Sequence, residues 1–419
     1  MVASRLFVLI WVLPFILCAC STPSSDPLEI PMEALTIPIA TPTPVFGNYP
    51  TAQPGGIIVA MTAADISHKD IHQDISVTLA TRGPGISYSR LLRLRTGLDI
   101  KQPSLLIECD LCQHWEMSEP EVYRFVLRKD ITWQDISPVN GRKLTTKDIV
   151  YSYMRQRTED WPNSSLLSAI DTVEAQDDTT LKITLRFPDT DFLLALADGH
   201  TKVVAREVAE GPGGLKGGPV VGTGPWIWLD SQKDVGSVFE ANPDYYEPGL
   251  PLAHEIAFKV IRDPEIRAAS FITGLVNVYD TKPEGWEILE ANSTDYQTFQ
   301  SMDGGIGTLV AVNVSRYPFD NEETRRAIFY SLNPVAYLKE VWNDIGFISA
   351  GIPIIENSWS VTGAEGVNVF DDYSVSRLAQ NNDVEAFELI LADYGDRYLA
   401  IGNQVEQDLK KAGFDPKLK

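Results

Sequence analysis

One short segment of the chain has the residue types of a metal site. His68 and His72 lie four positions apart, among three aspartates: Asp65, Asp70 and Asp74. On a helix, residues four apart share a face, so the two histidines could hold a divalent cation. Two histidines without a fixed third ligand are a weak signal, however, and surface histidines explain them better. We therefore expect no resident metal and no cofactor.

A second pattern, Cys109-x-x-Cys112 with His114 nearby, could ligate zinc or close a disulfide. A zinc site of this kind needs a second ligand pair at matching spacing, and the sequence has none. In an oxidising compartment two neighbouring cysteines form a disulfide more readily than a thiol site. We expect a local Cys109–Cys112 disulfide.

The charges of the chain bear on catalysis and on nucleic-acid binding. It has 57 acidic and 35 basic residues, giving a formal net charge of −22. A carboxylate pair of the glycosidase type is conceivable, but so many acids create chance pairs. No nucleophile elbow, phosphate loop or metal-binding helix motif accompanies them. The acidity also argues against nucleic acid, whose phosphates require clustered Lys and Arg. We expect a protein that is not an enzyme.

The first 20 residues look like an export signal. Arg5 precedes an uncharged apolar run, Leu6 to Leu17, which is shorter than the ~20 residues of a membrane-spanning helix. The tetrapeptide LCAC that ends at Cys20 resembles the lipobox of bacterial lipoproteins, in which the cysteine is lipidated after cleavage before it. The alternative is an ordinary signal peptide with a chance cysteine. We expect residues 1–19 to be a lipoprotein signal peptide and Cys20 to anchor the chain on the extracytoplasmic face of a bacterial membrane.

Beyond this signal the chain divides into a tether and a folded part. Residues 20–54 are rich in proline and lack periodicity, which predicts a disordered tether. A capping box, Thr145-x-x-Asp148, predicts the start of a helix. The mixture of strands and helices indicates an α/β fold. Strands are predicted at 57–61, 122–127, 181–187, 237–240 and 256–261, and further helices at 322–332, 335–342 and 397–412, the last ending before Gly413.

Three stretches carry a resemblance to a known family. The first runs from the tryptophan strand at 115–128 to NGRKLTTKDIVYS at 140–152. The second is VGTGPW at 221–226 with NPDYY at 242–246, and the third runs from Asn313 through PFD to RRAI at 325–328. In this order they resemble the family 5 extracellular solute-binding proteins, the oligopeptide, dipeptide and nickel group. The likeness extends over roughly residues 55–419.

The resemblance implies a two-lobed fold of the periplasmic-binding-protein type, type II and peptide-binding class, with lobes that close on a solute. We expect lobe I with an extra small subdomain at 55–270 and lobe II at 271–419. Members of this family continue past this length to complete the first lobe, so we expect the C-terminal part of that lobe to be missing here. A truncated gene, a genuine short variant and a decaying gene would each explain this.

The resemblance also implies partners and candidate ligand-binding residues. The expected partners are a peptide or similar small solute, an ABC permease with its ATPase, and the membrane through the lipid anchor, with the protein a monomer. The candidates are Tyr88, Asn313, Trp342 and Trp359. Core packing is the alternative explanation for each aromatic residue. The GTGP segment at 222–225 is expected to be a structural turn rather than a ligand contact.

Two other functions remain open at this stage. A lipoprotein that no longer takes part in transport could serve as a sensor or an interaction module. A nickel or oligosaccharide binder would also fit the same scaffold.

Overall fold

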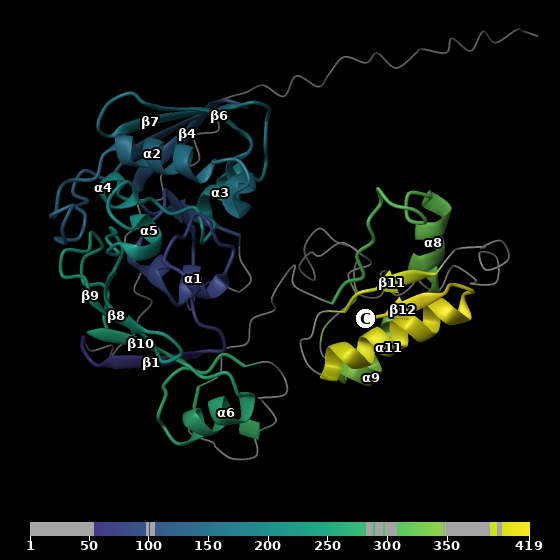
Figure 1. Cartoon of the computed structure of the whole chain (residues 1–419). Coiled ribbons are helices and arrows are strands. Elements are labelled where there is room, and N and C mark those ends of the chain that lie inside the picture. Colours follow the sequence, from purple (N-terminus) through teal and green to yellow (C-terminus); the bar gives the residue numbers. More distant parts are fainter. Residues whose placement is uncertain are drawn as a thin grey trace, which may run out of the picture. The chain divides into compact units, whose positions relative to one another are not determined.

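The computed structural model describes residues 54–97, 100, 105–281, 288–289, 296–297, 308–344, 346, 348, 386–391 and 396–419 (Figure 1). We call residues 54–281 the N-terminal body and residues 308–419 the C-terminal body, in each case meaning their described parts. The segment predicted as signal peptide, Cys20, the tether as far as residue 53, and Trp359 lie outside the described residues.

A mixed four-stranded sheet forms one part of the N-terminal body. Its strands are β1 (Ile57–Thr62), β10 (Glu255–Val260), β9 (Gly236–Ala241) and β8 (Trp226–Gln232), in that order across the sheet. β1 and β10 run parallel, and the other two pairs are antiparallel. Alternate residues of these strands meet in a small core of Ala60, Phe239 and Phe258. Burial of these side chains on one face of the sheet stabilises the parallel pairing of β1 with β10.

A second, antiparallel sheet forms the other part of this body. Its order is β4 (Cys112–Glu119), β5 (Val122–Leu127), β7 (Thr180–Leu185) and β6 (Ile170–Ala175). In β5 the alternate residues Tyr123, Phe125 and Leu127 are buried in the large core, whereas Arg124 is exposed. The remaining elements of the body are α1 (Val77–Thr81), η1 (Pro84–Ser87), β2 (Leu92–Leu94), β3 (Ile107–Cys109), α2 (Thr146–Gln156), η2 (Pro162–Leu167), α3 (Phe192–Ala197), α4 (Arg206–Ala209), α5 (Gly214–Gly217) and α6 (Pro264–Ile272).

Helix α2 begins where its sequence predicts. The Thr145 N–H donates to Oδ2 of Asp148 at 2.9 Å, so the carboxylate satisfies a backbone group that the helix leaves free. The same carboxylate accepts two bonds from Arg142, at 2.7 and 3.0 Å. Arg142 also pairs with Glu207 of α4. Asp148 is thus connected through Arg142 to α4 as well as to the start of α2.

The segment that follows α6 is hydrogen-bonded to β1. Asn277 receives a bond from the Val59 N–H on its Oδ1 at 2.8 Å and donates its own N–H to the Val59 carbonyl at 2.7 Å. These contacts satisfy the outward-facing backbone groups of Val59 on the edge strand. The lobe boundary expected at 270/271 falls inside α6, and the N-terminal body continues beyond it, at least to Asp280.

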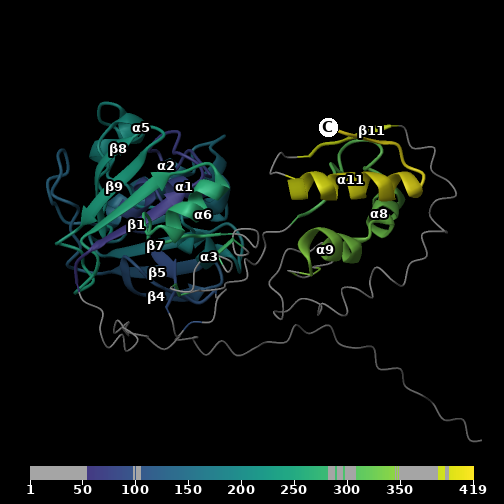
Figure 2. The same cartoon turned by 90° about the horizontal axis from the view of Figure 1, so that it is seen from below.

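The C-terminal body contains α8 (Glu322–Ser331), α9 (Pro334–Trp342), α11 (Asp396–Lys411) and a parallel pair of short strands, β11 (Phe387–Leu389) and β12 (Pro416–Leu418). α11 packs against α8, α9 and β12 (Figure 2). Its buried residues Ile401, Val405 and Leu409, at helical spacing, form the centre of a local core. Gly413, at φ 90°, ends the helix as predicted.

The predicted strands and helices within these ranges are confirmed, with bounds that differ by at most two residues. Asn321 and Asn333 cap α8 and α9 through their side chains. None of the helices in the described ranges has both the length and the apolar character that a membrane crossing requires.

Candidate functional site

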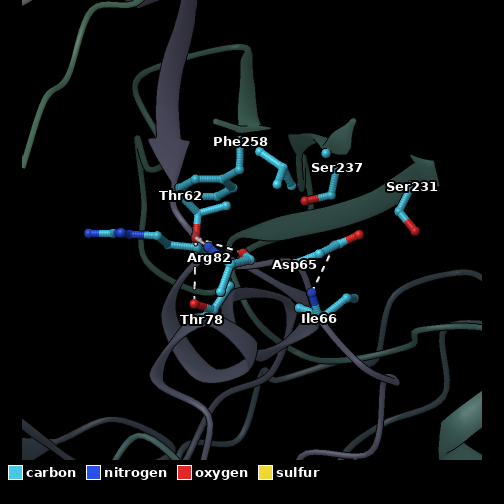
Figure 3. Close-up of a pocket in the computed structure, with 11 residues that line it drawn as sticks. Thr62, Asp65, Ile66, Thr78, Arg82, Ser231, Ser237 and Phe258 are labelled. Atoms are coloured by element: carbon cyan, nitrogen blue, oxygen red, sulfur yellow. Dashed lines mark hydrogen bonds between the residues drawn. The ribbon is translucent and has the colours of Figure 1, made fainter. Parts of the chain in front are cut away.

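The carboxyl ends of the parallel strands β1 and β10 open on a small hollow (Figure 3). In open α/β sheets, ligands bind outside the carboxyl ends of parallel strands. The enclosed part of this hollow has room for about one water molecule, so it can receive one small group of a solute rather than a whole peptide. Its lining residues are Thr62, Ala64, Asp65, Ile66, Thr78, Arg82, Ser231, Gly236, Ser237, Phe258 and Val260.

Hydroxyl groups form much of the polar lining. The Thr62 hydroxyl, at the end of β1, donates to the Ala64 carbonyl at 2.9 Å and lies 3.5 Å from the hydroxyl of Thr78 in α1. Thr62 and Ser237 are buried, whereas Ser231 is exposed. A hydroxyl both donates and accepts, so these groups can meet either polarity of a neutral or zwitterionic solute.

Two charged side chains border the hollow. Asp65 accepts the N–H groups of Ile66 at 2.8 Å and Asp234 at 2.7 Å, which commits its carboxylate to the loop. Arg82, the residue that caps the C-terminal end of α1, forms an ion pair with Asp280 at 2.7 Å between Nη2 and Oδ2. Figure 3 shows the guanidinium of Arg82 extending away from the hollow, with its stem on the lining.

The lining offers groups that can bind a solute. It offers hydroxyls, one carboxylate, one guanidinium and an apolar floor that includes Phe258 and Val260. Such a surface can hold a small polar solute by hydrogen bonds and one charge.

The histidines considered as metal ligands have other roles in the structure. His72 is fully buried: its Nε2 lies 2.9 Å from the Lys202 carbonyl and its Nδ1 lies 3.0 Å from Nη1 of Arg155. The guanidinium can only donate, so Nδ1 accepts, Nε2 carries the hydrogen and the ring is neutral. Burial, followed by the positive charge of Arg155, lowers the pKa of His72 to about 4. Both ring nitrogens are occupied, and the expectation of surface histidines is wrong for His72.

His68 and the neighbouring aspartates do not complete a metal site either. His68 lies 3.9 Å from Asp74 through Nε2, and Asp70 forms a bidentate ion pair with Arg155 at 2.6 and 3.1 Å. Among the described residues, no three His, Cys, Asp or Glu side chains are grouped so as to hold a metal ion.

Cys109 and Cys112 are joined by a disulfide, and both are buried. The turn between them presents Asp110, whose Oδ2 accepts the Arg90 N–H at 3.0 Å and whose Oδ1 accepts the Tyr246 hydroxyl. The cysteine pair therefore fixes a buried carboxylate at the junction of β3 and β4.

Tyr88 and the glycine turn belong to the interior of the N-terminal body. Tyr88 is buried, which raises the pKa of its phenol, and its carbonyl accepts from Nζ of Lys202 at 3.3 Å. The Gly222 N–H donates to Gln134 and the Gly224 N–H donates to Ser87. A Cβ at Gly222 would lie 1.8 Å from the Ser87 oxygen. This close approach supports the expectation of a structural turn at 222–225.

The two candidates in the C-terminal body also have local partners. Asn313 is exposed, and its Oδ1 accepts the Ser315 N–H at 3.0 Å. Trp342 is half-buried against the local core, with the guanidinium of Arg397 5.5 Å from its ring and Tyr398 in edge contact. The ligand-binding roles of Tyr88, Asn313 and Trp342 remain predictions.

Sequence reasoning missed the residues of the hollow. Thr62 and Arg82 belong to no motif of fixed spacing, and their neighbours in the hollow come from β8, β9 and β10. One signal was present: the first predicted strand ends at this point, and the residues that follow a parallel strand are where ligands bind.

The fold resembles that of periplasmic binding proteins of type II. The DppA periplasmic binding protein from Helicobacter pylori, solved with the peptide STSA, superposes with a TM-score of 0.64 at 20% identity, covering 88% of this chain and 74% of that one. NikZ from Campylobacter jejuni, solved with Ni(L-His), gives a TM-score of 0.64 at 18% identity, covering 87% and 73%.

The family is established by the sequence. Residues 107–419 match the model of bacterial extracellular solute-binding proteins, family 5 middle, and the chain belongs to this family. It is 24% identical over 359 residues to the dipeptide-binding protein of Escherichia coli (strain K12), covering 79% of this chain and 65% of that protein. It is 26% identical over 296 residues to heme-binding protein A of Haemophilus influenzae, covering 65% of this chain and 52% of that protein. The chain thus spans roughly half to two-thirds of these curated relatives.

Two predictions are confirmed: the family, by the match over residues 107–419, and the α/β binding-protein fold, by the similar structures.

Proposed function

We propose that this protein is the solute-binding subunit of an ABC importer, which captures a peptide or similar small solute between two lobes and delivers it to a membrane permease and its ATPase. The observation that carries the proposal is the family match over residues 107–419. The hollow at the carboxyl ends of β1 and β10, with its hydroxyls and a single guanidinium, supports it as part of the solute-contacting surface.

Short peptides are the solute class that the relatives favour. Four of them are named for dipeptides or for di- and tripeptides, and others are named for glutathione, which is itself a tripeptide. Heme and nickel-histidine also occur among the relatives and similar structures. We propose a di- or tripeptide, and the other solutes serve as alternatives in the test.

The test is the thermal unfolding of the purified protein with dialanine, trialanine, reduced glutathione, heme or nickel-histidine. A ligand at 100 times its Kd adds about 2.7 kcal/mol to the stability of a protein that binds it only when folded. We expect a peptide to raise the midpoint and heme and nickel-histidine to leave it unchanged. A shift with heme or nickel-histidine alone would replace the peptide proposal, and no shift with any probe would contradict solute binding.

We also propose that the protein is a monomeric lipoprotein, with a signal peptide at 1–19, a lipid on Cys20 and a tether at 20–54. The supporting observation is the LCAC tetrapeptide after a short apolar run. Cells fed radiolabelled palmitate should label the wild-type protein but not the Cys20→Ala variant. A Cys18→Ala variant is the matched control and should keep its label. Equal labelling of the Cys20→Ala variant would refute the anchor.

A further inference from the structure

The Cys109–Cys112 disulfide closes a turn that holds a charged side chain inside the N-terminal body. The bond joins the end of β3 to the start of β4, and the turn between the cysteines consists of Asp110 and Leu111. Asp110 is 6% exposed, and Leu111 is fully buried. A carboxylate withdrawn from water in this way is stable only where donors face it, so the position of the turn matters.

The carboxylate of Asp110 receives hydrogen bonds from segments far away in the sequence. Its Oδ2 accepts the backbone N–H of Arg90 at 3.0 Å, and its Oδ1 accepts the hydroxyl of Tyr246. Nη1 of Arg93 lies 3.7 Å from the same Oδ1. Loss of contact with water, and then the negative charge of Asp110, raises the pKa of Tyr246. The phenol therefore keeps the proton that it donates.

These bonds connect the two sheets of the N-terminal body. Tyr246 and Glu247 follow β9 of the mixed sheet, whereas Cys112 begins β4 of the antiparallel sheet. Nη2 of Arg93 lies 2.8 Å from the carboxylate of Glu247, so this arginine contacts both sides. We use the name Asp110 junction for the following residues: Arg90, Arg93, Asp110, Tyr246 and Glu247.

The disulfide restricts the conformation of the turn at the centre of this junction. With the S–S bond intact, Asp110 and Leu111 belong to a short closed ring, and few backbone conformations satisfy the geometry of the bond. With free thiols, both residues regain backbone freedom, and the bonds to Asp110 form only at the cost of ordering them again. The bonds of the Asp110 junction are therefore weaker when the thiols are reduced.

We propose that the Cys109–Cys112 disulfide is a redox-sensitive lock, which holds the Asp110 junction closed when oxidised and loosens it when reduced. Closing the lock forms the S–S bond and removes two electrons and two protons from the two thiols. An oxidant of the disulfide class, such as oxidised glutathione, takes them up and becomes two thiols. The inference goes beyond the proposed function, because it holds whichever solute is bound.

The first experiment measures whether the disulfide and Asp110 act together. Urea unfolding of the full chain is followed with and without a phosphine reductant, for the wild type and for Asp110→Asn. Loss of the loop closure lowers the folding equilibrium constant of both proteins alike. The lock adds a further loss of about fivefold in the wild type alone, which is within the range of coupling between residues in contact.

Three more proteins serve as controls. Tyr246→Phe removes one hydroxyl from the junction and should respond less to the reductant than the wild type does. Asp244→Asn is the matched control, because it removes the same charge from an exposed side chain two positions away, and should respond as the wild type does. The double variant Cys109→Ala with Cys112→Ala should show no response, which isolates this disulfide from the other cysteines.

The second experiment locates the effect by amide hydrogen exchange of the folded protein, which reports local opening. Reduction of the wild type should speed exchange of the Arg90 N–H, whose acceptor is Asp110, and of residues 242–247. Exchange in α2, at Thr146–Gln156, should stay the same.

Definite results would overturn the lock. An equal loss on reduction in the wild type and in Asp110→Asn would show that the disulfide acts through loop closure alone. Exchange that rises equally in α2 and in the Asp110 junction would show the same. If Asp110→Asn does not unfold cooperatively, Tyr246→Phe decides: a response to the reductant as large as that of the wild type would overturn the proposal.

Discussion

Replacing Asp70 by alanine should destabilise the N-terminal body by about 3–5 kcal/mol. The change removes the carboxylate that neutralises Arg155, and an uncompensated buried charge has a cost of this order. A natural domain has a total stability of about 5–15 kcal/mol, so the loss should consume a large part of it.

The magnitude follows from how deeply the pair is buried. The side chains of Asp70 and Arg155 are 2% and 13% exposed, and two N–O contacts join them at 2.6 and 3.1 Å. After the substitution Arg155 keeps the ring nitrogen of His72 and the face of Trp161, 4.7 Å away. Neither group is negatively charged. The backbone N–H of His72 also loses its bond to Oδ1 of Asp70, at 3.1 Å.

Urea unfolding of the intact protein, followed by fluorescence, measures the effect as a shift in midpoint at constant slope. Glu116→Gln is the control: its ion pair with Arg124 is about half exposed and 3.8 Å long, and should contribute about 0–1 kcal/mol. The double variant Asp70→Ala with Arg155→Leu should recover part of the loss, because no buried charge remains. If Asp70→Ala shifts the midpoint no further than Glu116→Gln, the reasoning from burial is refuted.

Three further changes test other parts of the N-terminal body. Burial, and then the charge of Arg90, lowers the pKa of Lys202 to about 7. Between pH 7 and about 10.4 the Lys202 amine is therefore protonated in the unfolded chain and neutral in the folded one. Because the unfolded chain binds one more proton, the free energy of unfolding should rise with pH across this window. Lys202→Met should raise the melting midpoint at pH 7 and flatten that rise, and an unchanged pH profile would contradict it. Replacing Cys109 and Cys112 by serine should cost about 2 kcal/mol from the closure of a four-residue loop, and two free thiols in the oxidised wild type would contradict the disulfide. Gly222→Ala should lower the free energy of unfolding by about 1–3 kcal/mol or more, since its Cβ would meet a backbone carbonyl. Gly217→Ala, with open space around its Cβ, should lower it far less.

The local structure of this protein is largely readable from its sequence, because the signals for it are local. The Thr145-x-x-Asp148 pattern begins α2, Gly413 ends α11, and alternation in the segment 122–127 gives β5 one buried face. Each of these features depends on residues within one or two turns of chain. The disulfide likewise joins cysteines three positions apart, where few alternatives compete.

The features that could not be predicted from the sequence depend on contacts between residues far apart along the chain. Asp70 and Arg155 are 85 positions apart, and nothing in either segment marks the other as its partner. His72 was expected on the surface because two histidines without a third ligand are a weak metal signal, although in the fold its ring contacts the Lys202 carbonyl and the Arg155 guanidinium. The hollow has the same origin, since its lining comes from five elements and the loops beside them.

The arginines of the N-terminal body differ in what their charges contribute to its structure. A buried guanidinium shared among carboxylates, as in Arg93, is costly to displace, because its removal would leave buried negative charge without a partner. A guanidinium held by one exposed carboxylate, as in Arg82, costs little to redirect, because water solvates both partners when they separate. The first kind of charge therefore fixes the geometry of this body, whereas the second kind contributes little to it.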